Sequence, residues 1–208
     1  MSNLLLTITG PTASGKTTLQ RILCELGFER LITCTTRSPR PGEVPGREYF
    51  FVDRQLFLEM IAAGEMAEYV ERGGELYGLP VSQLLRASQS DAPCVVVVDP
   101  RGALKVAQKA RERPLSVFAL FMSGSKRFLL ERYLKRELGT GSPDLSEMAE
   151  RIVCLLDEEM SWESAMDWSA MASDFGPENQ VEVVHFLVDY ACRRMGRKDW
   201  LKTQEAAA

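Results

Sequence analysis

The stretch from Gly10 to Thr18 constrains the fold of this chain more than any other. It reads GPTASGKTT and fits G-x-x-x-x-G-K-[ST], the pattern of a phosphate-binding P-loop. Residues 4–9 before it are apolar or β-branched and predict a buried strand, whereas residues 17–26 repeat leucine and isoleucine at helical spacing. A strand, a glycine-rich loop and a helix together present backbone N–H groups to a phosphate.

The rest of the chain alternates strands with helices. Residues 94–99 include four consecutive valines, which is typical of a parallel strand buried on both faces. Residues 30–34 and 115–122 predict further strands, and residues 145–163 predict a long helix. We therefore expect an α/β protein with a P-loop NTPase-type doubly wound parallel sheet.

An insertion separates two parts of this core. Three prolines and two glycines within residues 35–47 exclude a regular element there. A strand, a helix capped by Asp53, a hairpin around residues 72–74 and a second helix are expected to follow. The boundaries that we expect are 1–34 and 91–208 for the core and 35–90 for a small α+β insertion.

The composition limits the possible partners. A net charge of -4 over 208 residues argues against a general nucleic-acid or membrane-surface binder. The five cysteines form no C-x-x-C pair, which indicates reduced thiols in a cytoplasmic compartment. No run approaches ~18 apolar residues, and the N-terminus lacks the charged region of a signal peptide. We expect a cytoplasmic protein that binds small molecules, and its oligomeric state stays open.

The P-loop predicts a nucleoside triphosphate, ATP, together with Mg²⁺. Lys16 would reach the β- and γ-phosphates, and Thr17 would offer its hydroxyl to Mg²⁺. Asp99 follows the valine strand at its carboxyl end, where open α/β sheets bind ligands. We expect Asp99 to act on the water shell of Mg²⁺ or on the acceptor nucleotide.

The insertion resembles one family specifically. Residues 35–52 match the guanylate kinase segment TTR-x-PR-x-GE-x-x-G-x-x-Y-x-F, and residues 64–78 continue the match in register. The similarity covers most of the chain from Leu4 to about Tyr190. It implies transfer of a phosphoryl group from ATP to a nucleoside monophosphate, GMP or dGMP first of all, with a mobile lid closing over the site.

Several acceptor residues also stand out on physical grounds. Arg37 and Arg40 lie in an irregular loop and can each form bidentate contacts with a phosphate. Glu68 shares a strand face with apolar neighbours and therefore needs hydrogen-bond donors. In the family, the matching glutamate accepts from guanine, and the arginines and Tyr49 hold the monophosphate. The resemblance assigns the acceptor to Thr33, Arg37, Arg40, Tyr49, Glu68, Tyr77, Leu79 and Asp99.

The lid is expected near residues 137–146. Arg132 and Arg136 lie four apart on one helix face, and Arg151 lies in the first turns of the next helix. The resemblance implies that these arginines close over the transferring group. It assigns catalysis to Lys16, Arg136, Arg151 and Asp99, and ATP binding to Gly10, Pro11, Thr12, Ala13, Ser14, Gly15, Lys16, Thr17, Thr18 and Arg132.

Two residues depart from the family pattern. Leu79 stands where the family has a serine or threonine that contacts the base, and Val97 replaces the first acid of Asp-x-Asp. Losing a hydrogen-bond partner costs roughly 1–3 kcal/mol, so base specificity is expected to be weakened or altered. The alternatives are a modified purine deoxynucleotide, a phosphorylated sugar as in ribose bisphosphate kinases, or a non-catalytic binding module. The intact P-loop disfavours the module, and Glu68 disfavours the sugar.

Overall fold

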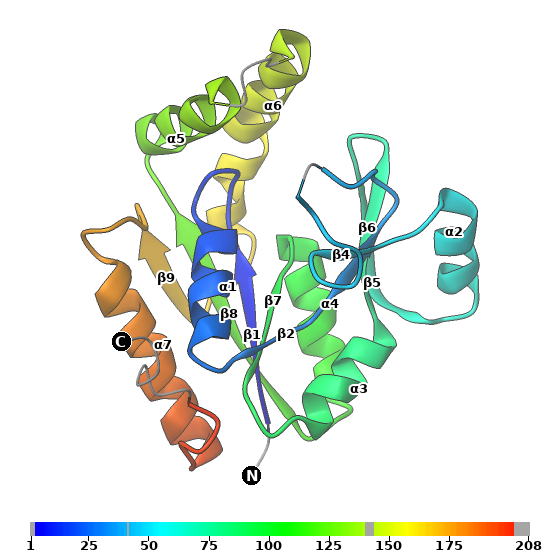
Figure 1. Cartoon of the computed structure of the whole chain (residues 1–208), viewed down its shortest axis with the longest axis vertical. Helices are drawn as coiled ribbons and strands as arrows, with labels where there is room; N and C mark the ends of the chain where they lie inside the picture. The colour runs from blue at the N-terminus through cyan, green and yellow to red at the C-terminus, as the bar shows by residue number, and fades with distance from the viewer. Residues whose placement is uncertain (1–2, 41, 140–143, 202–208) are drawn as a thin grey trace.

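A five-stranded parallel sheet forms the centre of the protein, in the order β2-β7-β1-β8-β9 (Figure 1). The computed structural model describes residues 3–40, 42–139 and 144–201. The strands are β1 (Asn3–Thr9), β2 (Glu29–Arg30), β7 (Cys94–Val97), β8 (Leu115–Ser123) and β9 (Ala170–Ser173). The chain winds outward from β1 in both directions, which confirms the doubly wound parallel sheet.

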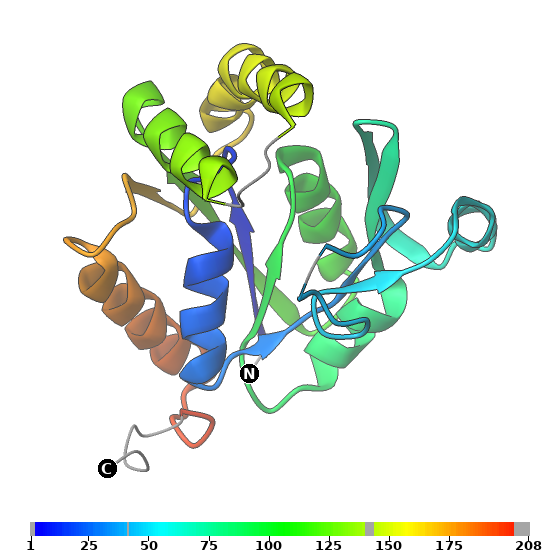
Figure 2. The same ribbon diagram turned by 45° about the horizontal axis from the view of Figure 1, so that its top comes forward.

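Helices cover both faces because successive residues of β1 point to opposite sides. Leu4, Leu6 and Ile8 join one apolar cluster, whereas Leu5 joins another. Helices α1 (Lys16–Glu25) and α7 (Gln180–Met195) cover the first face, side by side in Figure 2. Helices α3 (Val81–Gln89) and α4 (Pro100–Ala110) cover the second.

The insertion forms a second sheet of four strands, β4-β3-β6-β5. Its elements are β3 (Thr33–Thr35), β4 (Tyr49–Phe51), α2 (Arg54–Ala62), β5 (Met66–Arg72) and β6 (Glu75–Pro80). Gly73 and Gly74 turn the hairpin with φ of 57° and 77°, a conformation that glycine adopts without strain. Asp53 caps α2 by accepting from the Leu56 N–H at 2.8 Å, as predicted.

The prediction of one strand over residues 30–34 is wrong. The chain pairs as β2 in the core sheet, then crosses into the small sheet and pairs as β3. At the crossing, the Leu31 N–H donates to the Val95 carbonyl at 3.0 Å, and the Ile32 N–H donates to Gln83 Oε1 at 3.0 Å. The run contains no turn residue, so its local pattern could not reveal the change of sheet.

Two helices lie above the carboxyl ends of the core strands (Figures 1 and 2). They are α5 (Lys126–Leu138) and α6 (Leu145–Asp157). The helix predicted over residues 145–163 in fact ends at Asp157, and a 3₁₀ helix, η1 (Glu159–Ser164), replaces its last turns. The expected lid loop at 137–146 contains residues 140–143, which lie outside the described residues. Across the described ranges, no helix is long and apolar enough to span a membrane.

Candidate active site

The P-loop joins β1 to α1 and is shaped by close backbone approaches. A Cβ on Gly10, whose φ is +153°, would lie 2.2 Å from the Met122 carbonyl oxygen. Gly15 has a φ of +98° and precedes the first residue of α1. The Ser14 hydroxyl is buried, and within the described part of the chain it has no hydrogen-bond partner. A phosphate in the loop would supply the acceptor that this hydroxyl lacks.

Lys16 folds back over the loop in which it stands. Its Nζ donates to the Gly10 carbonyl at 2.8 Å and to the Pro11 carbonyl at 2.7 Å. Burial, and after it the nearby guanidinium groups of Arg72, Arg151 and Arg136 in that order, together lower the pKa of Lys16 to about 7. The lysine is therefore close to losing its charge before any anion arrives.

Binding of ATP is expected to take up a proton at Lys16. The phosphates favour the charged ammonium and would raise its pKa from about 7. Uptake should approach one proton at about pH 8, where the free lysine is mostly neutral, and vanish near about pH 6, where it is already charged. Calorimetric titration in buffers of different ionisation enthalpy measures this, and equal uptake by Lys16→Met would contradict it.

A narrow hollow of about 40 Å³ connects the P-loop helix with the small sheet. Thr17, Thr33, Tyr49 and Val97 are among the residues that line it. No cluster of three or more His, Cys, Asp or Glu side chains that could hold a metal ion occurs in the ranges described. Thr17 is exposed on the first turn of α1, and one hydroxyl suits Mg²⁺, which takes its remaining ligands from phosphates and water.

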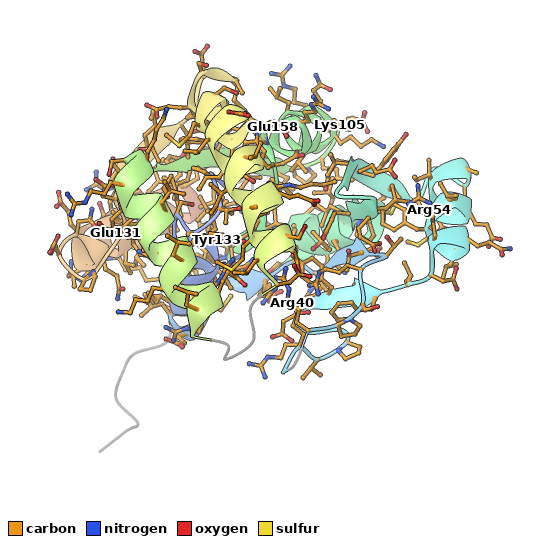
Figure 3. The ribbon with its side chains drawn as sticks, turned by 90° about the horizontal axis from the view of Figure 1, so that it is seen from above. Arg40, Arg54, Lys105, Glu131, Tyr133 and Glu158 are labelled. Carbon is orange, nitrogen blue, oxygen red and sulfur yellow. The ribbon has the colours of Figure 1, made fainter. Side chains whose placement is uncertain are left out.

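Arg37 of the insertion lies beside a pair of tyrosines, and Arg40 stands on the same loop. Arg37 Nη2 bonds both carboxylate oxygens of Glu43 at 2.9 Å, and its guanidinium lies 5.6 Å from the centre of the Tyr49 ring. The rings of Tyr49 and Tyr77 are 6.3 Å apart. The Arg40 side chain is exposed on the same loop, as Figure 3 shows from above. Glu43 thus fixes Arg37 beside the tyrosines, and Arg40 stays accessible.

Glu68 is a buried carboxyl group with 5% of its surface exposed. It accepts from the Leu79 N–H and lies against Gly102, where an added Cβ would be 2.9 Å from Oε2. Burial and then the neighbouring Asp99 carboxylate raise the pKa of Glu68 to about 8. The group is poised to ionise when suitable donors replace the water that it has lost.

Asp99 and Leu79 lie beside Glu68. Asp99 caps α4, its Oδ1 accepting from the Gly102 N–H at 2.6 Å. The Leu79 side chain is fully buried in the apolar cluster that contains Leu5 and Leu84. Beside this packing, the backbone N–H of Leu79 donates to the Glu68 carboxyl group.

The three arginines expected at the lid each hold different partners. Arg132 Nη1 donates to the Phe175 carbonyl at 2.6 Å, close to Gly15 of the P-loop. Arg136 pairs with Glu137 at 2.7 Å, and Arg151 pairs with Glu159 at 2.7 Å. Arg151 also donates to the Thr12 hydroxyl, so it reaches the P-loop directly.

Two residues beside the P-loop escaped the sequence interpretation. Glu159 has no exposed surface, and Arg72, at the end of β5, pairs with it. Glu159 was hidden because it follows two other acids, Asp157 and Glu158, in a stretch that the pattern placed inside a helix. Arg72 was read as part of a hairpin turn, although a cation beside two glycines is a weak sign of an anion site.

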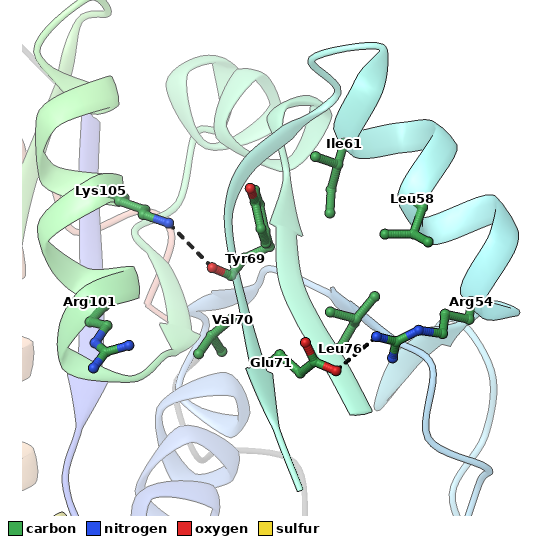
Figure 4. A pocket seen from close by; sticks show the side chains of 9 residues that line it. All are labelled: Arg54, Leu58, Ile61, Tyr69, Val70, Glu71, Leu76, Arg101 and Lys105. Atoms are coloured by element: carbon green, nitrogen blue, oxygen red, sulfur yellow. Dashed lines mark hydrogen bonds and ion pairs between the residues drawn. The ribbon is translucent and has the colours of Figure 1, made fainter. Parts of the chain in front are cut away.

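A larger hollow of about 460 Å³ lies between the small sheet, α2 and α4 (Figure 4). It is lined by Arg54, Leu58, Ile61, Tyr69, Val70, Glu71, Leu76, Arg101 and Lys105. Tyr69 and Glu71 alternate with Glu68 along β5 and therefore face away from it. Arg54 pairs with Glu71 at 2.8 Å, and Lys105 donates to the Tyr69 carbonyl at 3.3 Å. Its lining includes none of the residues that the sequence assigns to the acceptor.

Comparisons with known proteins agree with this geometry. The guanylate kinase family model matches residues 2–162. A guanylate kinase of Wolbachia sp. subsp. Brugia malayi is 32% identical over 187 residues, covering 89% of this chain and 91% of the relative. One of Trichormus variabilis is 35% identical over 188 residues, covering 89% and 90%. The crystal structure of guanylate kinase from Anaplasma phagocytophilum has a TM-score of 0.67 at 23% identity, covering 96% of this chain and 90% of that one.

Proposed function

The chain belongs to the guanylate kinase family, and from this premise we infer that its P-loop and small sheet together transfer a phosphoryl group from ATP to GMP. The products are ADP and GDP. The observation that carries the assignment of this site is the hollow that Thr17 shares with Thr33 and Tyr49. It supports a site in which the donor and acceptor phosphates meet between the core and the insertion.

Donor binding is proposed for the P-loop. Backbone N–H groups, the Ser14 hydroxyl and Lys16 would surround the β- and γ-phosphates. Thr17 would supply one oxygen ligand to Mg²⁺, which when bound neutralises charge between these phosphates. Arg132 lies next to Gly15 and would contact the donor from the side of the lid.

Acceptor binding is proposed for the small sheet. Glu68 in its ionised form would accept from the guanine N1–H and 2-amino group, with the Thr33 hydroxyl contacting the base beside it. Arg37, Arg40 and Tyr49 would hold the monophosphate, and Tyr77 lies next to them. Asp99 would complete the acceptor side, close to Glu68 at the first turn of α4.

The reaction needs positioning and charge rather than a base. A nucleoside monophosphate is already ionised near neutral pH, and phosphoryl transfer passes through a loose transition state. Lys16 and Arg151, both at the P-loop, would stabilise the charge on the transferring group, and Arg136 would join them from α5. Closure of the lid over residues 137–146 would exclude water as a competing acceptor.

The family assignment does not favour a phosphorylated sugar as the acceptor, or a non-catalytic module. The two departures from the family pattern, Val97 and Leu79, concern instead which base is selected. Val97 lines the hollow where the family has an acid, and the Leu79 side chain is turned into the core. Neither change removes Glu68. We therefore propose that guanine is still selected, through the Glu68 carboxylate and the Thr33 hydroxyl, with fewer polar contacts than the family pattern provides.

A panel of acceptors tests this proposal. ADP release from ATP and Mg²⁺ is measured with GMP, dGMP, AMP, CMP, UMP and dTMP in turn. We expect kcat/KM for GMP or dGMP to exceed that for AMP by at least about 100-fold, because a buried carboxylate left without donors penalises the wrong base. Equal activity with all acceptors, or none with guanine nucleotides, would contradict the proposed role of Glu68.

A further inference from the structure

One buried carboxylate links three parts of the protein beside the P-loop. Glu159 accepts from the Thr12 N–H of the P-loop and pairs with Arg151 of α6 at 2.7 Å. It also pairs with Arg72, which belongs to the hairpin of the insertion. No part of Glu159 is exposed. Since a buried charge is stable only when it is paired, these contacts form one unit.

Arg72 reaches from the acceptor-binding insertion to the core. Its guanidinium lies 5.3 Å from the centre of the Trp162 ring, and its Nη2 lies 3.7 Å from the Cys154 sulfur. The side chain keeps 33% of its surface exposed, whereas its partner Glu159 keeps none. The guanidinium is therefore held in place and still has donors that are open to a ligand.

The charges around Arg72 require an anion. Arg72 and Arg151 share the single carboxylate of Glu159, while Lys16 stands close enough that both guanidinium groups disfavour its ammonium. Cations gathered in a partly buried site repel one another unless negative charge enters between them. A phosphoryl group in transfer carries such charge, spread over its equatorial oxygens. Arg72 is placed to meet that group from the acceptor side.

We propose that Arg72 is a further catalytic residue, which contacts the phosphoryl group during its transfer, and that Glu159 positions its guanidinium. This inference rests on the proposed function, since it needs both nucleotides in the site. It assigns the hairpin of the insertion a role at the donor end, in addition to the acceptor contacts made by Glu68 and Tyr77.

Substitution of Arg72 tests the proposal by turnover and by binding. Arg72→Met is expected to lower kcat by about 30- to 100-fold with KM for ATP and GMP changed less than about threefold, because the lost contact belongs to the transition state. Affinity for ADP, GMP and aluminium fluoride together, a mimic of the transferring group, should fall by a similar factor. Affinity for ADP alone should not change.

A double-mutant cycle separates this role from a structural one. If Arg72 touches the phosphoryl group, Arg72→Met should still cost at least about tenfold in kcat when introduced into Glu159→Gln. If the loss disappears in this background, and Arg72→Met alone also leaves the affinity for ADP, GMP and aluminium fluoride unchanged, then Arg72 serves only its carboxylate partner and the proposal is overturned. Should Glu159→Gln not fold, Arg72→Lys replaces the cycle, and recovery of at least about a third of the lost kcat is the supporting result.

The matched control is Arg54→Met, which removes an exposed arginine that also pairs with a hairpin residue, Glu71. Its kcat should stay within about twofold of wild type, because exposed ion pairs contribute little. Wild-type protein that fails to phosphorylate GMP would refute the proposed function instead. Active wild type with an equally active Arg72→Met variant would refute this inference alone.

Discussion

Replacement of Lys16 by methionine is expected to lower kcat for GMP phosphorylation by at least about 1000-fold. In the proposed donor site, the ammonium is the cation that the P-loop itself brings to the β- and γ-phosphates, and such charges act on the transition state in a site from which water is excluded. Its Nζ is already held by the carbonyls of Gly10 and Pro11, so the group is positioned before ATP binds and gains its full charge when the phosphates arrive. Steady-state release of ADP from ATP and GMP measures the effect.

The control for this substitution is stability. Methionine keeps the length of the side chain and removes a charge whose burial is unfavourable, so the melting temperature should be unchanged or slightly higher. A thermal unfolding curve checks this. A folded Lys16→Met variant with the turnover of wild type would refute the assignment of the P-loop as the donor site.

Replacement of Glu68 by glutamine is expected to raise KM for GMP by about 100-fold and to reduce the preference for guanine. The amide has one oxygen acceptor, and its NH₂ group would face donors on the base, so at least one hydrogen bond is lost and a buried polar group is left unpaired. Activity with GMP and AMP, measured for both proteins, gives the change in selectivity. Glu65→Gln, an exposed change just before β5, is the control.

The same variant is expected to change the pH dependence. Because burial raises the pKa of Glu68 to about 8, the folded protein favours the protonated acid. Its contribution to stability is complete below the ordinary carboxyl pKa of about 4.5 and is lost as pH rises through about 8, which amounts to about a few kcal/mol. Chemical denaturation at several pH values should show this decline in wild type and not in Glu68→Gln. GMP should bind wild type more tightly as pH rises over the same range.

The P-loop and the parallel sheet could be predicted because their signals are local. Gly10 and Gly15 adopt the positive φ angles that the motif requires, and valines of β7 are buried on both faces of the sheet. Pairing partners and broken helices are set by tertiary contacts instead. The crossing at Leu31 depends on strands far along the chain, and the end of α6 depends on the P-loop contact made by Glu159.

The site could be predicted only in part, for a related reason. Residues that match a linear motif, such as Arg37 and Glu68, could be named from the sequence and lie on the small sheet or its loops. Arg72 and Glu159 are 87 positions apart, and only the fold brings their charges together. The pattern of apolar residues in the sequence cannot show that one acid of a charged run, Glu159, is buried in the folded protein.

The crossing between the two sheets is also the place where we expect the insertion to turn against the core. The chain enters the small sheet at Thr33 and leaves it at Pro80, and β3 and β6 are neighbours in that sheet. We expect these two adjacent connections to act as a hinge, with Ile32 anchored beside it by the Gln83 side chain, so that a rotation breaks no ladder of backbone hydrogen bonds. Arg72, next to the hairpin tip at Gly73, lies far from this hinge, so the same rotation would pull its guanidinium away from Glu159.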